Sequence, residues 1–220
     1  MEKIAIAIDG PSGAGKSTIA KIIADKLNIT YIDTGAMYRA AALKLIRNSI
    51  DLSNIDSIKC LIDKLDICIK GDRIYLDGED VTDEIRTPKV SKAASDVSTI
   101  KCVREKLVSL QRQMAVNQSV IMDGRDIGTN VLKGADVKIF LTASMEERAK
   151  RRYIELINKG YRLNYDDVLN DMKIRDIQDT TREINPLKVS DDSIIIDTTG
   201  KSIQDVVSEI ISNIKEPCNQ

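Results

Sequence analysis

A glycine-rich segment near the N-terminus constrains the fold of this chain more than any other feature. It fits the pattern G-x-x-x-x-G-K-[ST] at every fixed position, with Gly10, Gly15, Lys16 and Ser17 in those places. The apolar run 4–8 before it is rich in β-branched residues, as in a buried parallel strand, and apolar residues recur at helical spacing after it. The motif therefore lies between a strand and a helix, where this pattern forms a phosphate-binding loop.

The residue types in this loop suit a polyphosphate ligand. Glycines let backbone N–H groups turn inward around an anion, and the following helix directs its positive end at the same point. Lys16 would neutralise the charge on the β- and γ-phosphates of a triphosphate, and the Ser17 hydroxyl would be a hard oxygen ligand for Mg²⁺. We expect Lys16 to be exposed, with little packing to lose. The predicted triphosphate-binding residues are Gly10, Pro11, Ser12, Gly13, Ala14, Gly15, Lys16, Ser17 and Thr18.

The alternative for this segment is a glycine turn that merely connects a strand to a helix, with Lys16 solvated. Such a turn would need neither the lysine nor the hydroxyl that follows it, so the complete pattern favours the phosphate loop.

Composition limits the classes of protein to consider. With 220 residues, 42% of them hydrophobic, the chain is long enough for one main domain with a small inserted lobe. The net charge of -1 argues against a nucleic-acid polymer or a membrane surface as partner, since such proteins usually carry a strong basic excess. No signal peptide or membrane span is visible, because the first apolar run ends at Asp9. We expect a cytoplasmic monomer.

Cysteine and histidine usage narrows the chemistry further. Cys60, Cys68, Cys102 and Cys218 are scattered and form no C-x-x-C pair, so we expect reduced, partly buried thiols rather than a disulfide or metal site. Histidine is absent, which excludes a Ser-His-Asp triad, a Cys-His dyad and any histidine metal site. Phosphoryl transfer is compatible with this restriction because its catalysis is mostly positioning and charge stabilisation.

Short apolar strands alternate with helical patterns along most of the chain. This alternation predicts an α/β fold with a five-stranded parallel sheet and helices on both faces. Asn54 and the Ser144/Glu147 pair are candidate helix caps. Residues 66–81 read instead as short antiparallel strands joined by Gly/Asp turns, which predicts a small β insert at about 66–87. The five predicted parallel strands are 4–8, 29–32, 119–122, 136–141 and 193–196.

Polar motifs follow the predicted parallel strands, and ligands bind at the carboxyl ends of such strands. Asp123 comes directly after a strand, where it could hold a metal-bound water, so Ser17 and Asp123 are the predicted Mg²⁺ site. The alternative is a helix cap or turn aspartate. Four arginines have the planar donors that suit phosphate oxygens, although a single surface arginine is most often a solvated charge. They are Arg39, Arg125, Arg175 and Arg182.

Together these motifs resemble the bacterial cytidylate kinase family. The residues that carry the resemblance are the phosphate loop, Asp33 to Arg39, Asp123 to Thr129, and Arg175-Asp176 with Asp179 and Arg182. It covers essentially the whole chain, and it implies a phosphate-loop nucleoside monophosphate kinase, a single kinase domain over 1–220. Such a kinase has a monophosphate-binding lobe, here about 34–100 and including the β insert, and a helical lid, here about 152–173. The implied reaction moves the γ-phosphate of ATP, with Mg²⁺, to CMP or dCMP.

The resemblance also implies roles for individual residues. Arg39 and Arg125 would hold the acceptor phosphate, and Arg182 would reach the transferring phosphate from the lid side. Thr34 stands where serine is frequent and keeps the hydroxyl. The implied catalytic residues are Lys16, Arg125 and Arg182. The implied CMP-binding residues are Thr34, Arg39 and Arg125 with Ser95, Arg104 and Asp126 at the cytosine edge and Arg175 and Asp179 at the sugar.

Two other functions can be compared with this reading. A regulatory GTPase would need Asn-Lys-x-Asp, but the only Asn-Lys, at residues 158–159, continues as Gly160-Tyr161. A kinase for another monophosphate, such as UMP or AMP, remains open. Asp126 favours cytosine, because an ionised carboxylate only accepts hydrogen bonds and cytosine presents an N4 donor where uracil has an acceptor.

Overall fold

The computed structural model describes residues 3–215 of the chain. The fold separates into two compact units. The first unit runs to Tyr31 and resumes at Gln118, and the second unit spans Ile32–Asn117.

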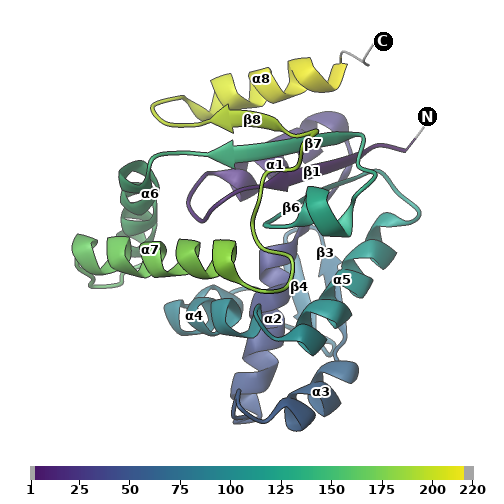
Figure 1. The fold of residues 1–220 in the computed structure, drawn as a ribbon, viewed down its shortest axis with the longest axis vertical. Helices are drawn as coiled ribbons and strands as arrows, with labels where there is room; N and C mark the ends of the chain where they lie inside the picture. Colours follow the sequence, from purple (N-terminus) through teal and green to yellow (C-terminus); the bar gives the residue numbers. More distant parts are fainter. Residues whose placement is uncertain (1–2, 216–220) are drawn as a thin grey trace. The chain divides into compact units, whose positions relative to one another are not determined.

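A five-stranded sheet forms the centre of the first unit, in the order β2-β6-β1-β7-β8 (Figure 1). The pairs β1/β6, β1/β7 and β7/β8 run parallel, and β2 starts in this unit with a bond from Thr30 N to Ser119 O of 3.0 Å. The predicted parallel sheet is therefore confirmed. Its strands are β1 (Ala5–Asp9), β2 (Thr30–Asp33), β6 (Val120–Gly124), β7 (Val137–Thr142) and β8 (Ile194–Asp197).

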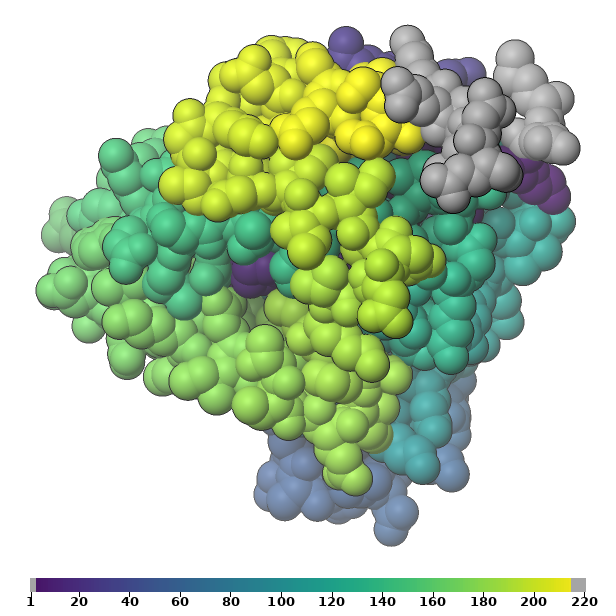
Figure 2. Space-filling model, turned by 45° about the horizontal axis from the view of Figure 1, so that its top comes forward, coloured from purple at the N-terminus to yellow at the C-terminus, as the bar shows by residue number. Residues whose placement is uncertain are grey.

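The core of the first unit lies between this sheet and two helices, α1 (Lys16–Leu27) and α8 (Ile203–Lys215). Their apolar faces pack against strand residues such as Ile6 and Ile121, which are fully buried. In Figure 2, α8 is the yellow layer on the surface of this unit. The register places Asp9 opposite Gly124 of β6, so the ends of these two adjacent strands lie side by side.

Two further helices belong to the first unit, α6 (Met145–Asn158) and α7 (Tyr165–Thr181). Ser144 caps α6 as expected, because its side chain accepts a hydrogen bond from Glu147 N. Gly160 follows α6 with a φ of 84°, the left-handed conformation that ends many helices. The two helices pack on one another through a small apolar cluster around Leu156 and Met172.

The second unit joins helices to the predicted antiparallel insert (Figure 1). Strands β3, β4 and β5 form this sheet, and positive φ values at Gly71, Asp77 and Gly78 belong to its turns. Asn54 caps α3 through its side chain, as the sequence predicts. The elements are α2 (Thr34–Arg47), α3 (Ile55–Asp63), β3 (Ile67–Lys70), β4 (Arg73–Leu76), β5 (Glu79–Asp80), η1 (Glu84–Arg86), α4 (Pro88–Val97) and α5 (Lys101–Ala115).

The thiols differ in part from expectation. Cys68 and Cys102 are half-buried free thiols, whereas Cys60 is exposed, because it lies on the outer side of α3, away from Ile58 and Ile62. Cys218 lies outside the described residues. Between residues 3 and 215 no helix combines the length and apolar character needed to cross a bilayer.

Candidate functional site

The phosphate loop connects β1 to α1 and depends on glycine at two close approaches. Gly10 has a φ of 146°, and a Cβ there would lie 2.0 Å from the backbone oxygen of Leu141 on β7. Gly13 has a φ of 77°, and a Cβ there would lie 2.9 Å from the backbone oxygen of Arg148. A side chain at either position would displace backbone, so the loop takes this path only with glycine.

Lys16 is the first residue of α1, and its side chain folds back over the loop. Its ammonium nitrogen donates to Pro11 O at 2.7 Å, and only 6% of the residue is exposed. The expectation of an exposed lysine is therefore wrong, because the side chain folds back onto the loop and bonds the Pro11 carbonyl instead of extending into solvent. Burial, together with the charge of Arg125, lowers the pKa of Lys16 well below its usual range, and Asp123 opposes this shift.

Asp123, near the end of β6, accepts hydrogen bonds on both carboxylate oxygens. The Ser17 hydroxyl donates to Oδ2 at 2.8 Å, and the Tyr31 hydroxyl donates to Oδ1 at 2.8 Å. No group of three or more carboxylate, thiol or imidazole side chains suited to a metal occurs among the residues that the structure describes. A hydroxyl beside one carboxylate still fits Mg²⁺, which keeps several waters and takes further oxygens from substrate phosphates.

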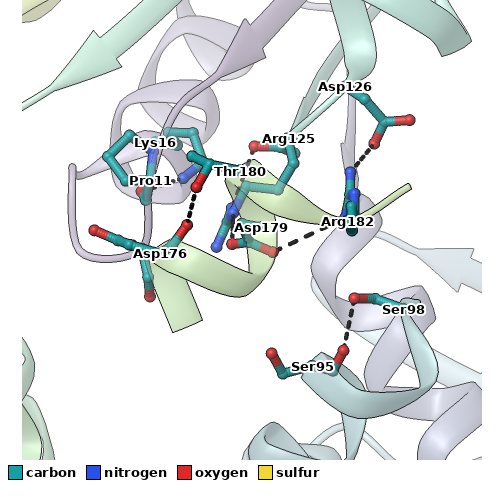
Figure 3. A network of polar contacts seen from close by, with 12 residues as sticks. Pro11, Lys16, Ser95, Ser98, Arg125, Asp126, Asp176, Asp179, Thr180 and Arg182 are labelled. Carbon is teal, nitrogen blue, oxygen red and sulfur yellow. Dashed lines mark hydrogen bonds and ion pairs between the residues drawn. The ribbon is translucent and has the colours of Figure 1, made fainter. Parts of the chain in front are cut away.

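Two arginines of the first unit are each paired with a carboxylate, the half-buried Arg125 with Asp179 and the buried Arg182 with Asp126 (Figure 3). Arg125 Nε donates to Asp179 Oδ2 at 2.7 Å, and Arg182 Nη2 donates to Asp126 Oδ1 at 3.0 Å. Arg182 also lies 3.9 Å from the other oxygen of Asp179. The guanidinium groups are thus fixed in place before any ligand arrives, which reduces the ordering cost of binding an anion.

The charges in this network shift one another's pKa values. Burial tends to raise the pKa of Asp179, but Arg125 and Arg175 outweigh burial and hold it below its ordinary value. Burial tends to lower the pKa of Arg125, and Asp179 reverses this effect, so the guanidinium stays charged. Arg175 also acts on Lys16 through its charge.

Asp126 has contacts that the sequence did not predict. One oxygen accepts from Arg182, and the other accepts from Asn130 Nδ2 at 3.0 Å. The residue is 5% exposed, so its carboxylate is oriented by these two partners. A base that binds Asp126 would share the carboxylate with them.

The second unit holds the other predicted residues. Asp33 caps α2 by accepting from Ala36 N at 2.7 Å and pairs with Arg39 Nη2 at 3.0 Å. Arg104 is 1% exposed, donates to Ser98 O at 3.2 Å, and lies 5.7 Å from the centre of the Tyr38 ring.

The predicted residues divide between the two units. Ser95 and Thr34 are buried in the second unit, and the Ser98 hydroxyl donates to Ser95 O at 2.7 Å (Figure 3). The residues of the first unit are the phosphate loop with Lys16 and Ser17, and Asp123, Arg125, Asp126, Arg175, Asp179 and Arg182; those of the second are Thr34, Arg39, Ser95 and Arg104.

Several residues that contact the backbone carbonyls of the phosphate loop were not identified from the sequence. Arg148 of α6 donates to Ser12 O at 3.1 Å and pairs with Asp176 of α7 at 2.7 Å. Arg151 donates to the Thr198 hydroxyl at 3.0 Å, and that hydroxyl lies 3.3 Å from Ala14 O. The arginine-rich character of α6 was the only available signal, and it did not indicate which arginines point at the loop.

Comparisons with known proteins agree with this geometry. The family model described as cytidylate kinase matches residues 6–216. A cytidylate kinase from Caldicellulosiruptor saccharolyticus is 54% identical over 215 residues, which cover 96% of this chain and 95% of that protein. One from Clostridium perfringens is 52% identical over 213 residues, covering 97% and 98%.

A solved structure of an uncharacterised protein from Eubacterium ventriosum aligns with a TM-score of 0.52 and 16% identity over 97% of this chain and 98% of that one, which shows a similar fold alone. The family model and the identities over nearly full length decide the classification. This chain belongs to the cytidylate kinase family.

Proposed function

We propose that this protein transfers the γ-phosphate of ATP to CMP or dCMP, giving CDP or dCDP for pyrimidine nucleotide metabolism. The observation that carries the proposal is the convergence of Lys16, Ser17 and Asp123 at the carboxyl ends of two adjacent parallel strands. Such a convergence suits a nucleoside triphosphate. Membership of the cytidylate kinase family supports the choice of acceptor.

Lys16 and the backbone of residues 10–18 bind the phosphates of ATP in this proposal. Without a ligand, burial and Arg125 lower the pKa of Lys16. A polyphosphate anion favours the charged ammonium, so bound ATP would raise the pKa of Lys16 again at the place where negative charge develops.

Ser17 and Asp123 would hold Mg²⁺, the serine directly and the aspartate through a metal-bound water. The ion would supply charge neutralisation at the triphosphate. To serve as a ligand, the Ser17 hydroxyl would give up its hydrogen bond to Asp123 Oδ2, while the Tyr31 hydroxyl would keep the other oxygen of Asp123 oriented.

Arg125 and Arg182 are assigned to the phosphates that react. Arg125 would hold the acceptor phosphate, and Arg182 would stabilise the transferring group. Their pairing with Asp179 and Asp126 fixes the direction of both guanidinium groups. Fixed cations reduce the reorganisation needed as charge moves between donor and acceptor oxygens.

The remaining residues are assigned to the nucleoside and phosphate of CMP. In the first unit, Asp126 would accept from the cytosine amino group, and Arg175 and Asp179 would contact the sugar. In the second unit, Ser95 and Arg104 are assigned to the cytosine edge, Arg39 to the acceptor phosphate and Thr34 to CMP. The burial of Arg104 supports a specific role, since an unpaired surface charge would be exposed.

The proposal includes an organisation into parts of one kinase domain over 1–220. Residues 34–100 form the monophosphate-binding lobe, and residues 152–173 form a lid that excludes water during transfer. Hydrogen exchange in the lid should slow when ATP and a CMP analogue are both added, and unchanged exchange would refute closure. We also propose a cytoplasmic monomer that acts on free nucleotides without nucleic-acid polymers or membranes, and light scattering would test its mass.

A panel of acceptors tests the function. The purified chain is assayed for ADP formation with ATP, Mg²⁺ and each of CMP, dCMP, UMP, AMP and GMP. We expect CMP and dCMP to have much higher kcat/KM than the purines, and UMP to be a weaker acceptor than CMP. Equal or better turnover of UMP or AMP would establish the alternative monophosphate kinase. ATP hydrolysis that needs no acceptor would contradict both the cytidylate kinase and the alternative monophosphate kinase.

A further inference from the structure

Asp9, the last residue of β1, uses both carboxylate oxygens on the backbone of another segment. Oδ1 accepts from Ile127 N at 2.8 Å, and Oδ2 accepts from Gly128 N at 2.8 Å. Asp9 is 5% exposed and directly precedes Gly10 of the phosphate loop. A single carboxylate thus connects the end of β1 to a segment more than a hundred positions later in the chain.

The two amides that Asp9 binds begin the short helical element η2 (Ile127–Val131). The first N–H groups of a helix lack acceptors within the helix, so a carboxylate facing them fixes where the helix starts. Arg125 and Asp126 immediately precede this element. The backbone oxygen of Asp126 accepts hydrogen bonds from the N–H groups of Asn130 and Val131 at the end of η2. The position of η2 therefore decides where the side chains of Arg125 and Asp126 originate.

The phosphate loop has its own anchors, independent of Asp9. Lys16 binds Pro11 O, Arg148 binds Ser12 O, and the Thr198 hydroxyl lies within hydrogen-bond distance of Ala14 O. Loss of the Asp9 carboxylate should thus disturb the segment after β6 more than the loop itself.

The charge of Asp9 is unfavourable for folding. Burial raises the pKa of this carboxylate to about 6, with Asp126 adding to the shift, while the two backbone bonds and Lys16 oppose it. On β7, Lys138 lies close to Gly128, but its ammonium pairs with Asp192, and η2 has no titratable side chain. A carboxylate kept in such surroundings is poorly explained by stability alone.

We propose that Asp9 is a positioning residue for the acceptor side of the reaction, holding η2 so that Arg125 and Asp126 start from the correct backbone positions. This inference rests on the proposed function, which assigns Arg125 to the acceptor phosphate and Asp126 to cytosine. Asp9 itself touches neither substrate in this scheme. Its effect passes through the amides of Ile127 and Gly128.

Asp9→Asn tests the proposal, since asparagine has nearly the same shape but only one acceptor oxygen, and its NH₂ group would face one of the two amides. We expect kcat/KM for CMP to fall about 10- to 100-fold, the loss of one hydrogen bond to a charged group. We expect KM for ATP to change little and the melting temperature to stay equal or rise. If Asp9 were purely structural, the Asp9→Asn variant would instead lose stability together with activity.

Asp136→Asn is the matched control. Asp136 Oδ2 also accepts a backbone bond, from Ala5 N at 2.7 Å, but at the opposite end of β1. We expect this variant to keep the wild-type kcat/KM for CMP. Wild-type turnover of CMP is measured first, and its absence would refute the proposed function itself. If the wild type is active and Asp9→Asn has the same kcat/KM for CMP as the wild type or as Asp136→Asn, the positioning role is refuted and the proposed function is not.

Hydrogen exchange keeps the test decisive if Asp9→Asn does not fold. In the wild-type protein the amides of Ile127 and Gly128 should exchange as slowly as those of β6, because Asp9 holds them in a buried site. Fast exchange of both amides would show that Asp9 does not anchor η2, and would overturn the proposal.

Discussion

Arg125 Nε donates to Asp179 Oδ2 at 2.7 Å, joining the end of β6 to α7 across 54 positions of the sequence. The side chains of Arg125 and Asp179 are 16% and 5% exposed. Removal of one partner from a buried pair leaves the other charge uncompensated, which costs more than the pair itself contributes. The pair therefore has consequences for stability as well as for the direction of Arg125.

Asp179→Ala should lower the free energy of unfolding by about 3 kcal/mol at pH 7, because it leaves Arg125 buried without this carboxylate. The effect should depend on pH. Arg125 and Arg175 hold the pKa of Asp179 below the ordinary value of 3.8. The stabilisation is therefore present above pH 3.8 and is lost as the pH falls through the lower folded value. Urea unfolding near pH 7 and pH 3 measures both effects.

Asp171→Ala provides the comparison for that experiment, since Asp171 is an exposed acid on the same helix. It should change the free energy of unfolding little at either pH. A cost for Asp179→Ala that stays constant between the two pH values would contradict the assigned pKa direction.

Lys16→Met should lower kcat/KM by a factor equivalent to roughly 3 to 4 kcal/mol, because it removes the cation assigned to the phosphates. The fold should tolerate the change, since methionine has a similar length and burial disfavours the lysine charge. Steady-state kinetics and thermal unfolding measure the two effects. Lys26→Met, at an exposed position in the last turn of α1, should keep full activity. Near-normal turnover in Lys16→Met would refute the catalytic assignment.

The charge of Asp9 should make the protein less stable as the pH rises. Its folded pKa of about 6 lies above the ordinary 3.8, so the folded state binds a proton more readily than the unfolded state between these values. Stability from this group is complete below pH 3.8 and is lost as the pH rises to about 6, a total of roughly 3 kcal/mol. Urea unfolding at pH 4 and pH 7 measures this effect: the free energy of unfolding of the wild type relative to Asp9→Asn should fall by most of that amount between the two pH values. No shift would place the carboxylate in a more polar environment.

Asp126→Asn should narrow the preference for CMP over UMP, because an amide both donates and accepts. The narrowing should be about 1 to 3 kcal/mol in the ratio of kcat/KM values, as for one base-edge contact. The structure adds a competing role, since Asp126 also holds Arg182. Arg182→Ala separates the two: it should lower turnover of both substrates and leave their ratio unchanged. If Asp126→Asn also lost activity equally on CMP and UMP, Asp126 would serve only to hold Arg182, and base choice would lie with Ser95 and Arg104.

The sequence by itself determined the features whose signals are local. The phosphate loop lies between β1 and α1 as its pattern requires, and Asn54 and Ser144 cap the helices that they were expected to cap. The β insert and the five parallel strands also lie where periodicity predicted them. Each of these depends on residues a few positions apart, so backbone preference and apolar spacing are enough to specify them.

Only the tertiary structure decided which polar groups meet. The charges of Arg125 and Asp123 act on the buried Lys16, and Asp9 reaches Ile127 because β6 lies beside β1 in the sheet. The pairing of Arg125 with Asp179 likewise depends on how α7 packs. These contacts join segments far apart in the chain, and a pattern of single residues carries no information on strand order or helix packing. The sequence therefore predicted which charged residues belong to the candidate site, but not their partners, their burial or their pKa shifts.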